Sequence, residues 1–171
     1  MWAQRSTTSV SYLPTLAVSQ DTYVLFLCLQ THDLQEITMT TLEAQIHDKS
    51  KCAAGLKAAA AILEKWGASV EQATAILRIS RSTYARAKRR DPEWQVSLDK
   101  DQFTRISLVL NIHAALRVIF DNPENLYGFM AMANHNTYFH SRSPLQIISN
   151  GGILALYDTF RHLDSLRGAQ W

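Results

Sequence analysis

The chain has 171 residues, of which 47% are hydrophobic and 19% are charged, and its formal net charge is +2. This length and composition fit one globular domain or two small ones and exclude a disordered chain. Its two cysteines are too few for a disulfide framework, and no apolar run approaches the roughly 20 residues of a membrane-spanning helix, so we expect a cytoplasmic protein with no membrane partner.

Residues 1–38 differ in composition from the rest of the chain. They contain few charged residues, and serine and threonine dominate their first part. Residues 39–43, Met-Thr-Thr-Leu-Glu, look like an ordinary protein start. We therefore interpret residues 1–38 as an extension, either disordered or not native because of an over-long gene model. The alternative is a short strand at Tyr23–Leu29 that packs against a partner.

From about Leu42 onward, the spacing of apolar residues predicts helices and no β-hairpin, so we predict an all-α fold. The first helix, Lys51–Trp66, is rich in alanine and stops at Gly67. Ser69 opens a second helix with a capping box, and Ser80 caps a third helix that runs to about Arg90. The following Asp-Pro pair ends that third helix.

Four further helices are predicted after this point. Asp99 begins a long helix that is apolar on most of its surface, and we expect this helix at the centre of the core. Asn122 and the proline after it start a short helix, and a polar loop at 134–142 leads to the next. Ser143-Pro144 is a cap followed by proline at the first helical position. The last helix carries apolar residues from Ile153 to Leu166.

The basic residues are concentrated in one short stretch. Six basic residues and no acidic one lie between Arg78 and Arg90, whereas the stretch Asp99–Arg167 has six of each sign. A helix-turn-helix needs two short helices joined tightly, with apolar residues between them and polar residues outward on the second. The two helices between Ser69 and Arg90 fit this requirement. We predict that they bind double-stranded operator DNA and that the protein binds as a homodimer on palindromic half-sites.

The predicted DNA-binding residues form two groups. Arginine pairs bidentately with guanine edges, and serine and threonine suit bases or phosphates. Five residues project from the front of the second helix and are the first group: Ser80, Arg81, Ser82, Thr83 and Arg86. All of these except Ser80 are expected to face bases. Residues at the end of that helix suit phosphates, which add affinity without sequence choice: Lys88, Arg89 and Arg90.

Two residues depart from the usual pattern of such a motif. Thr74 occupies a position where alanine is common, and Arg78 lies in the turn where glycine is common, so both are expected to loosen the turn. The alternative to DNA binding is a basic, solvated helix hairpin that contacts no nucleic acid.

The C-terminal part contains a second pattern. The stretch Asn136-Thr-Tyr-Phe-His-Ser-Arg-Ser-Pro-Leu-Gln-Ile-Ile is followed by Asn150-Gly and a closing amphipathic helix. This order resembles the toxin-binding domain of the Xre/MbcA/ParS antitoxin family, and the resemblance spans Asp99 to Gly168. His135 stands where the family usually has proline, and His140-Ser141 replaces a glycine-rich part of the loop. A tryptophan that is common upstream is also missing.

The resemblance implies a type II antitoxin that neutralises an NAD-consuming RES-domain toxin and represses its own operon through the helix-turn-helix. It divides the chain into a DNA-binding domain at 39–98 and a toxin-binding domain with a C-terminal tail at 99–171. In complexes of the family the antitoxin's C-terminal end lies at the toxin's pocket. The implied toxin-binding residues are Asn136, Arg142, Arg167, Gly168, Gln170 and Trp171. The alternative is a tail that folds back, with Trp171 in the protein's own core.

A second class of function stays open. The chain could be a stand-alone DNA-binding protein, such as a small-molecule-sensing repressor or a phage packaging adaptor, whose C-terminal helices dimerise or bind a ligand. No nucleophile lies beside a base in a recognisable motif, and no histidine pairs with cysteine or carboxylate at ligand spacing. We therefore predict no enzyme activity, no cofactor and no metal site. His113 is interpreted as a core or interface histidine with satisfied hydrogen bonds.

Overall fold

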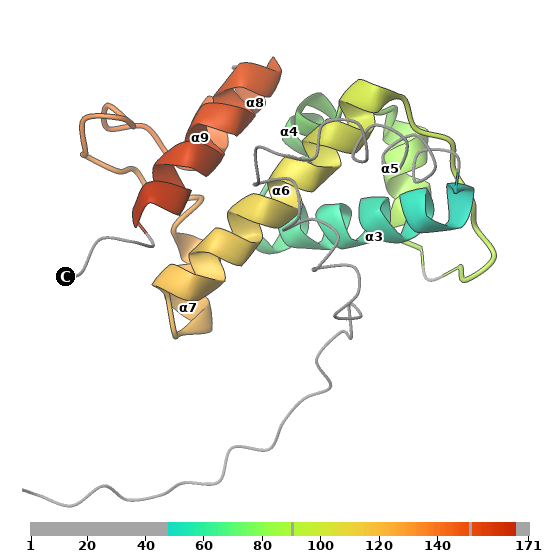
Figure 1. Ribbon diagram of the computed structural model, residues 1–171, viewed down its shortest axis with the longest axis horizontal. Helices are drawn as coiled ribbons and strands as arrows, with labels where there is room; N and C mark the ends of the chain where they lie inside the picture. The colour runs from blue at the N-terminus through green and yellow to red at the C-terminus, as the bar shows by residue number, and fades with distance from the viewer. Residues whose placement is uncertain (1–47, 90, 151, 167–171) are drawn as a thin grey trace, which may run out of the picture. The chain divides into compact units, whose positions relative to one another are not determined.

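The computed structural model describes residues 48–89, 91–150 and 152–166, and these residues form seven α-helices and no strand (Figure 1). The predicted all-α fold is confirmed for this part of the chain. The extension at 1–38 lies outside the described residues. So do five of the predicted site residues, namely Arg90, Arg167, Gly168, Gln170 and Trp171.

Helix α3 spans Lys49–Lys65 and begins where Asp48 caps it. The Asp48 carboxylate accepts hydrogen bonds from the backbone N–H groups of Ser50 and Lys51, both at 3.1 Å, which satisfies two of the donors left free at a helix start. This cap explains why the helix begins two residues before the predicted start. After Trp66 the chain leaves the helix through Gly67, whose φ of 77° is the left-handed conformation that glycine adopts without strain.

Helices α4, Val70–Leu77, and α5, Arg81–Ala87, form the predicted helix-turn-helix. Ser69 and Gln72 make the expected reciprocal capping box at the start of α4. Ser80 caps α5, but this helix is shorter than the prediction, which carried it to about Arg90. The Asp91-Pro92 pair that follows disfavours helical backbone before the proline, in keeping with an early end.

Helix α6, Lys100–Ile119, is the central helix of the described part of the chain. It contacts α3, α4, α7 and α9, and Figure 1 shows it lying between α3 and α9. Apolar side chains are buried along most of its length, including Ile106, Val109, Ile112, Ala115 and Leu116. The expected core helix is confirmed. Because it contacts helices from both halves of the chain, it sets the position of each half.

The C-terminal helices pack against the N-terminal ones. Helix α7 spans Pro123–Gly128, α8 spans Pro144–Asn150 and α9 spans Gly152–Leu166. Helix α8 contacts both α9 and α4, and α9 contacts α6. Contacts therefore cross the predicted boundary between residues 98 and 99. Within the described residues, none of the helices is long and apolar enough to cross a membrane.

His113 lies in the core on α6, but one part of its prediction is wrong. Its Nδ1 atom has no hydrogen-bond partner among the described residues, so the imidazole is not fully satisfied. The ring instead stacks on Tyr127, with centroids 5.7 Å apart and planes 15° from parallel. Burial, together with the positive charges of Arg117 and Lys65, lowers the pKa of His113 to about 4. The imidazole is therefore neutral at pH 7.

Candidate nucleic-acid interface and C-terminal groove

The turn between α4 and α5 closes despite the two unusual residues in the motif. Arg78 takes the left-handed conformation, with a φ of 53°, at the position where such motifs commonly have glycine. Its backbone N–H and that of Ile79 both donate to the carbonyl of Thr74, the latter at 3.2 Å. The Thr74 hydroxyl donates back to the carbonyls of Val70 and Glu71 at 2.9 and 3.0 Å. Neither residue disrupts the turn, because the backbone N–H groups of Arg78 and Ile79 close it on the Thr74 carbonyl and the Thr74 hydroxyl is bonded within α4.

Helix α5 has one buried side and one exposed side. Tyr84 and Ala87 are buried against the rest of the helix-turn-helix. The predicted base-reading residues Arg81, Ser82 and Arg86 are exposed, whereas Thr83 is half-buried. Ser82 and Arg86 lie four residues apart and therefore share one stripe of the helix, and Arg81 flanks that stripe at the start of the helix. The outer side of α5 therefore offers two guanidinium groups and a hydroxyl to a ligand.

Ser80 has the structural role that the sequence predicted for it, since it caps α5. Its hydroxyl accepts a hydrogen bond from the Thr83 backbone N–H at 3.0 Å, which is the N-cap of α5. The same oxygen lies 2.8 Å from the hydroxyls of Ser82 and Thr83. The three hydroxyls thus form one cluster at the start of the helix, where backbone N–H groups also favour an anion.

Each arginine of the exposed side has a neighbour within the protein. Nη2 of Arg81 lies 3.1 Å from Oε1 of Glu71 on α4, and both side chains are mostly exposed. Such exposed pairs are weak, so Arg81 can exchange this carboxylate for another acceptor. The guanidinium of Arg86 lies 5.7 Å from the centroid of the buried Trp94 ring. This cation–π contact holds the Arg86 guanidinium over the Trp94 ring.

The three predicted phosphate contacts differ in what they touch. Nζ of Lys88 lies 2.6 Å from Oε1 of Glu64 on α3, and this hydrogen bond raises the pKa of Lys88. Arg89 is exposed and forms no ion pair with another residue that the structure describes. Arg90 lies outside the described residues. Lys88 therefore ties α5 to α3, and Arg89 is the better placed of the two to meet a phosphate.

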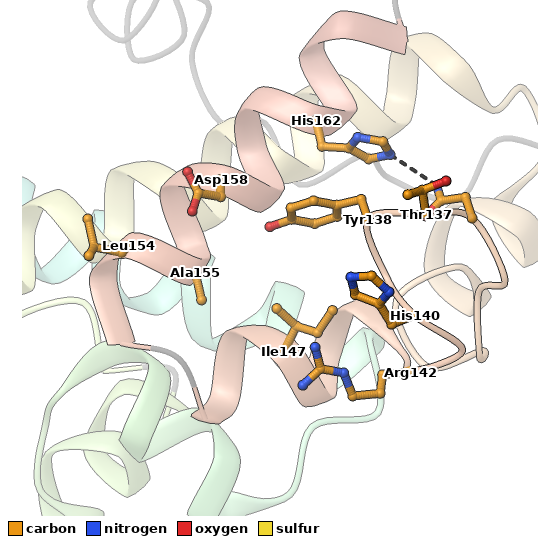
Figure 2. Close-up of a pocket in the computed structure, with 10 residues that line it drawn as sticks. Thr137, Tyr138, His140, Arg142, Ile147, Leu154, Ala155, Asp158 and His162 are labelled. Carbon is orange, nitrogen blue, oxygen red and sulfur yellow. Dashed lines mark hydrogen bonds between the residues drawn. The ribbon is translucent and has the colours of Figure 1, made fainter.

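An open groove lies in the C-terminal part, between the loop at 136–142 and helices α8 and α9 (Figure 2). Two of the predicted toxin-binding residues, Asn136 and Arg142, line this groove. Ile147 on α8 and Leu154, Asp158 and His162 on α9 line it too, although the sequence prediction did not select them. The three α9 residues follow one another at intervals of four, so they lie on one side of the helix. This four-residue period is the sequence signal that could have identified them as groove residues.

The loop side of the groove is built around Asn136 and Tyr138. The Asn136 side-chain oxygen accepts from the backbone N–H of the fully buried Phe139 at 3.0 Å, and its amide nitrogen donates to Nε2 of His162 at 3.0 Å. The Tyr138 ring stacks on His162 with centroids 4.7 Å apart, as Figure 2 shows. Burial lowers the pKa of His162. Asn136 therefore anchors the loop to α9.

The next residues of the loop adopt an unusual backbone. His140 and Ser141 have φ values of 48° and 61°, in the left-handed region, at the positions where the resembling family is rich in glycine. Hydrogen bonds hold this conformation, from the Ser141 N–H to the Asn134 carbonyl at 3.0 Å and from the Arg142 N–H to the Phe139 carbonyl at 2.9 Å. The tight bend brings the exposed Arg142 to the rim of the groove.

Residues 46–111 match the family model of the antitoxin Xre-like helix-turn-helix domain. The matched segment contains α3, α4, α5 and the N-terminal part of α6. The match supports an Xre-type antitoxin that binds DNA. No curated protein and no solved structure matches this chain.

Proposed function

We propose that this chain is the antitoxin of a type II toxin–antitoxin system, which neutralises an NAD-consuming RES-domain toxin and represses its own operon. The observation that carries the proposal is the exposed basic side of α5 within a segment that matches an antitoxin helix-turn-helix. The toxin half of the proposal is supported by the resemblance of Asp99–Gly168 to the toxin-binding domain of Xre/MbcA/ParS antitoxins.

In the DNA-bound state two copies of the chain would bind a palindromic operator. The recognition helices of such dimers enter successive major grooves, about 34–36 Å apart. Arg81 and Arg86 would contact base edges with help from Ser82 and Thr83, while Arg89, Arg90 and the hydroxyl cluster at Ser80 would contact phosphates.

In the toxin-bound state the C-terminal groove would receive part of the toxin. Arg142 supplies a cation at its rim, and Leu154 and Tyr157 on α9 are 72% and 47% exposed. Exposed apolar side chains beside a polar groove suit a protein interface. The tail Arg167–Trp171 follows α9 directly, and we propose that it enters the toxin's active site.

Co-expression tests the toxin half. The full chain should restore growth and NAD level in cells that express the RES-type protein encoded beside it, and Arg142→Ala and a chain lacking Gly168–Trp171 should protect less. Arg117→Ala serves as the matched control, because it also removes an exposed arginine but does not line the groove. Full protection by the truncated chain would remove the tail from the proposal. No protection by the full chain would favour a stand-alone DNA-binding repressor.

A gel shift with competitor DNA tests the DNA half. The double variant Arg81→Ala/Arg86→Ala should lose its preference for the operator while it keeps weak binding to unrelated DNA. Unchanged preference would remove both arginines from the base-reading surface.

A further inference from the structure

Arg78 is the first basic residue of the run that ends at Arg90, but its side chain is directed at carboxylates. Its Nη2 atom contacts Oδ2 of Asp99, and its Nε atom lies 2.6 Å from Oδ2 of Asp101. Gln102 completes the arrangement, since its side-chain nitrogen donates to the Arg78 carbonyl at 2.9 Å. All three partners lie at the N-terminal turn of α6. Both ends of Arg78, side chain and backbone, are therefore held by one turn of another helix.

The same turn of α6 also holds the end of α4. Nε of Arg105 lies 2.8 Å from Oδ2 of Asp101, and its Nη1 atom donates to the Ile76 carbonyl at 3.1 Å. Arg105 is only 8% exposed, and a charge this deeply buried needs a partner. The Asp101 carboxylate and the Ile76 carbonyl supply that compensation. Asp101 thus joins two arginines, one that closes the turn of the helix-turn-helix and one that holds the last turn of α4.

We infer that Arg78 is a positioning residue for α5 and does not contact DNA. The inference rests on the proposed DNA binding. Arg78 takes the left-handed conformation at the turn, and α5 begins three residues later, so the backbone of this residue sets the angle at which α5 leaves α4. The conformation is unfavourable for a residue with a Cβ atom. Its contacts with Asp99, Asp101 and Gln102 offset that cost and fix the angle.

Charge argues against a phosphate contact at this position. A phosphate that approached the Arg78 guanidinium would also approach the Asp99 and Asp101 carboxylates, which repel it. Removal of one of these carboxylates therefore distinguishes the two roles, because each role predicts the opposite change in the affinity for operator DNA. If Arg78 binds phosphate, Asp101→Asn strengthens binding to every DNA. If Arg78 positions α5, Asp101→Asn weakens binding to the operator and leaves binding to unrelated DNA unchanged or stronger.

The experiment compares Arg78→Gly, Asp101→Asn and the double variant with the full chain, using fluorescence anisotropy on operator and on scrambled DNA over a range of salt concentrations. Glycine is chosen because it adopts the left-handed turn without strain. Each single variant should lower the ratio of operator affinity to scrambled-DNA affinity at least 5-fold. In the double variant, the second substitution should lower this ratio by a smaller factor than it does when made alone. The slope of log affinity against log salt should stay that of the full chain.

Asp121→Asn is the matched control, since Asp121 is exposed just beyond the other end of α6 and forms no ion pair with a described residue. Helical circular dichroism and the melting temperature of each variant show whether it is folded. A fall in the salt slope of Arg78→Gly by about 0.9, the value for one lost phosphate contact, would overturn the inference. So would an unchanged affinity ratio in folded Asp101→Asn. If the full chain itself shows no preference for operator DNA, the proposed DNA-binding function fails, and the role of Arg78 fails with it.

Discussion

The side-chain amide of Asn136 donates to Nε2 of His162 at 3.0 Å, and this contact joins the loop after α7 to α9. The amide oxygen of Asn136 accepts from the Phe139 N–H, so its nitrogen is the atom that faces His162. A donor on that side requires Nε2 of the imidazole to be an acceptor. His162 is therefore neutral, in agreement with a pKa that burial lowers. This uncharged pair holds the loop side of the groove against α9, together with the Tyr138 ring that stacks on His162.

Asn136→Ala should open the loop side of the groove. The substitution removes both the bond to Phe139 and the bond to His162, and it leaves their polar groups without these partners, which costs about 1–3 kcal/mol of the free energy of unfolding. Urea unfolding followed by circular dichroism measures the loss. Thr137→Ala is the control, because Thr137 is exposed and makes no hydrogen bond with the described residues. An equal loss in both variants would mean that Asn136 does not anchor the loop.

Lys88 should become a stronger DNA contact when its partner on α3 is removed. Glu64→Gln removes the charge that faces Nζ of Lys88 at 2.6 Å, so the ammonium is free to turn towards a phosphate. We expect tighter binding to operator and scrambled DNA alike and a steeper salt dependence. The measurement is the same anisotropy titration, with Glu124→Gln on α7 as a control for net charge. A gain of equal size in both variants would show that only the overall charge matters.

The caps and the apolar periods made most of the helices predictable from sequence. Ser69, Ser80 and Asp99 each begin a helix where the capping pattern placed them, because a cap is a contact between residues close in the chain. The site is less predictable. The pairing of Arg78 with Asp101 and of Asn136 with His162 joins residues 23 and 26 positions apart, so no local pattern reveals either pair.

The same limit applies to the basic stretch Arg78–Arg90. Counting charges from Arg78 to Arg90 treats every cation as available to DNA. The structure pairs Arg78 with two carboxylates of α6, Arg81 with Glu71 and Lys88 with Glu64, and each of these acids lies outside that stretch. A local charge count overestimates the free positive charge wherever acids from other helices fold onto it.

Acid should destabilise the fold through His113. Its pKa is about 4 in the folded chain against an ordinary value of 6.5, so the unfolded chain binds more protons between these two pH values. The free energy of unfolding should therefore be unaffected by His113 above pH 6.5 and should fall as the pH drops towards 4, by up to about 3 kcal/mol. Denaturant unfolding from pH 7.5 to 4 measures the fall. His113→Phe keeps a ring beside Tyr127 and should flatten this part of the profile. An equally steep profile in His113→Phe would assign the acid sensitivity to other groups.

His140→Gly should stabilise the chain. His140 has a φ of 48°, a conformation that costs a residue with a Cβ atom roughly 1–2 kcal/mol and costs glycine nothing. Glycine also makes the unfolded chain more flexible, which offsets about 0.4–1 kcal/mol of this gain, so we expect a net increase in the free energy of unfolding of up to about 1.5 kcal/mol. Thr137→Gly is the matched control, since its φ is not positive, and it should destabilise the chain. Because the side chain of His140 lines the groove, a more stable His140→Gly protein that neutralises the proposed toxin partner less well would place this imidazole in the proposed interface. A loss of stability in His140→Gly would instead mean that contacts of the histidine side chain outweigh the backbone strain.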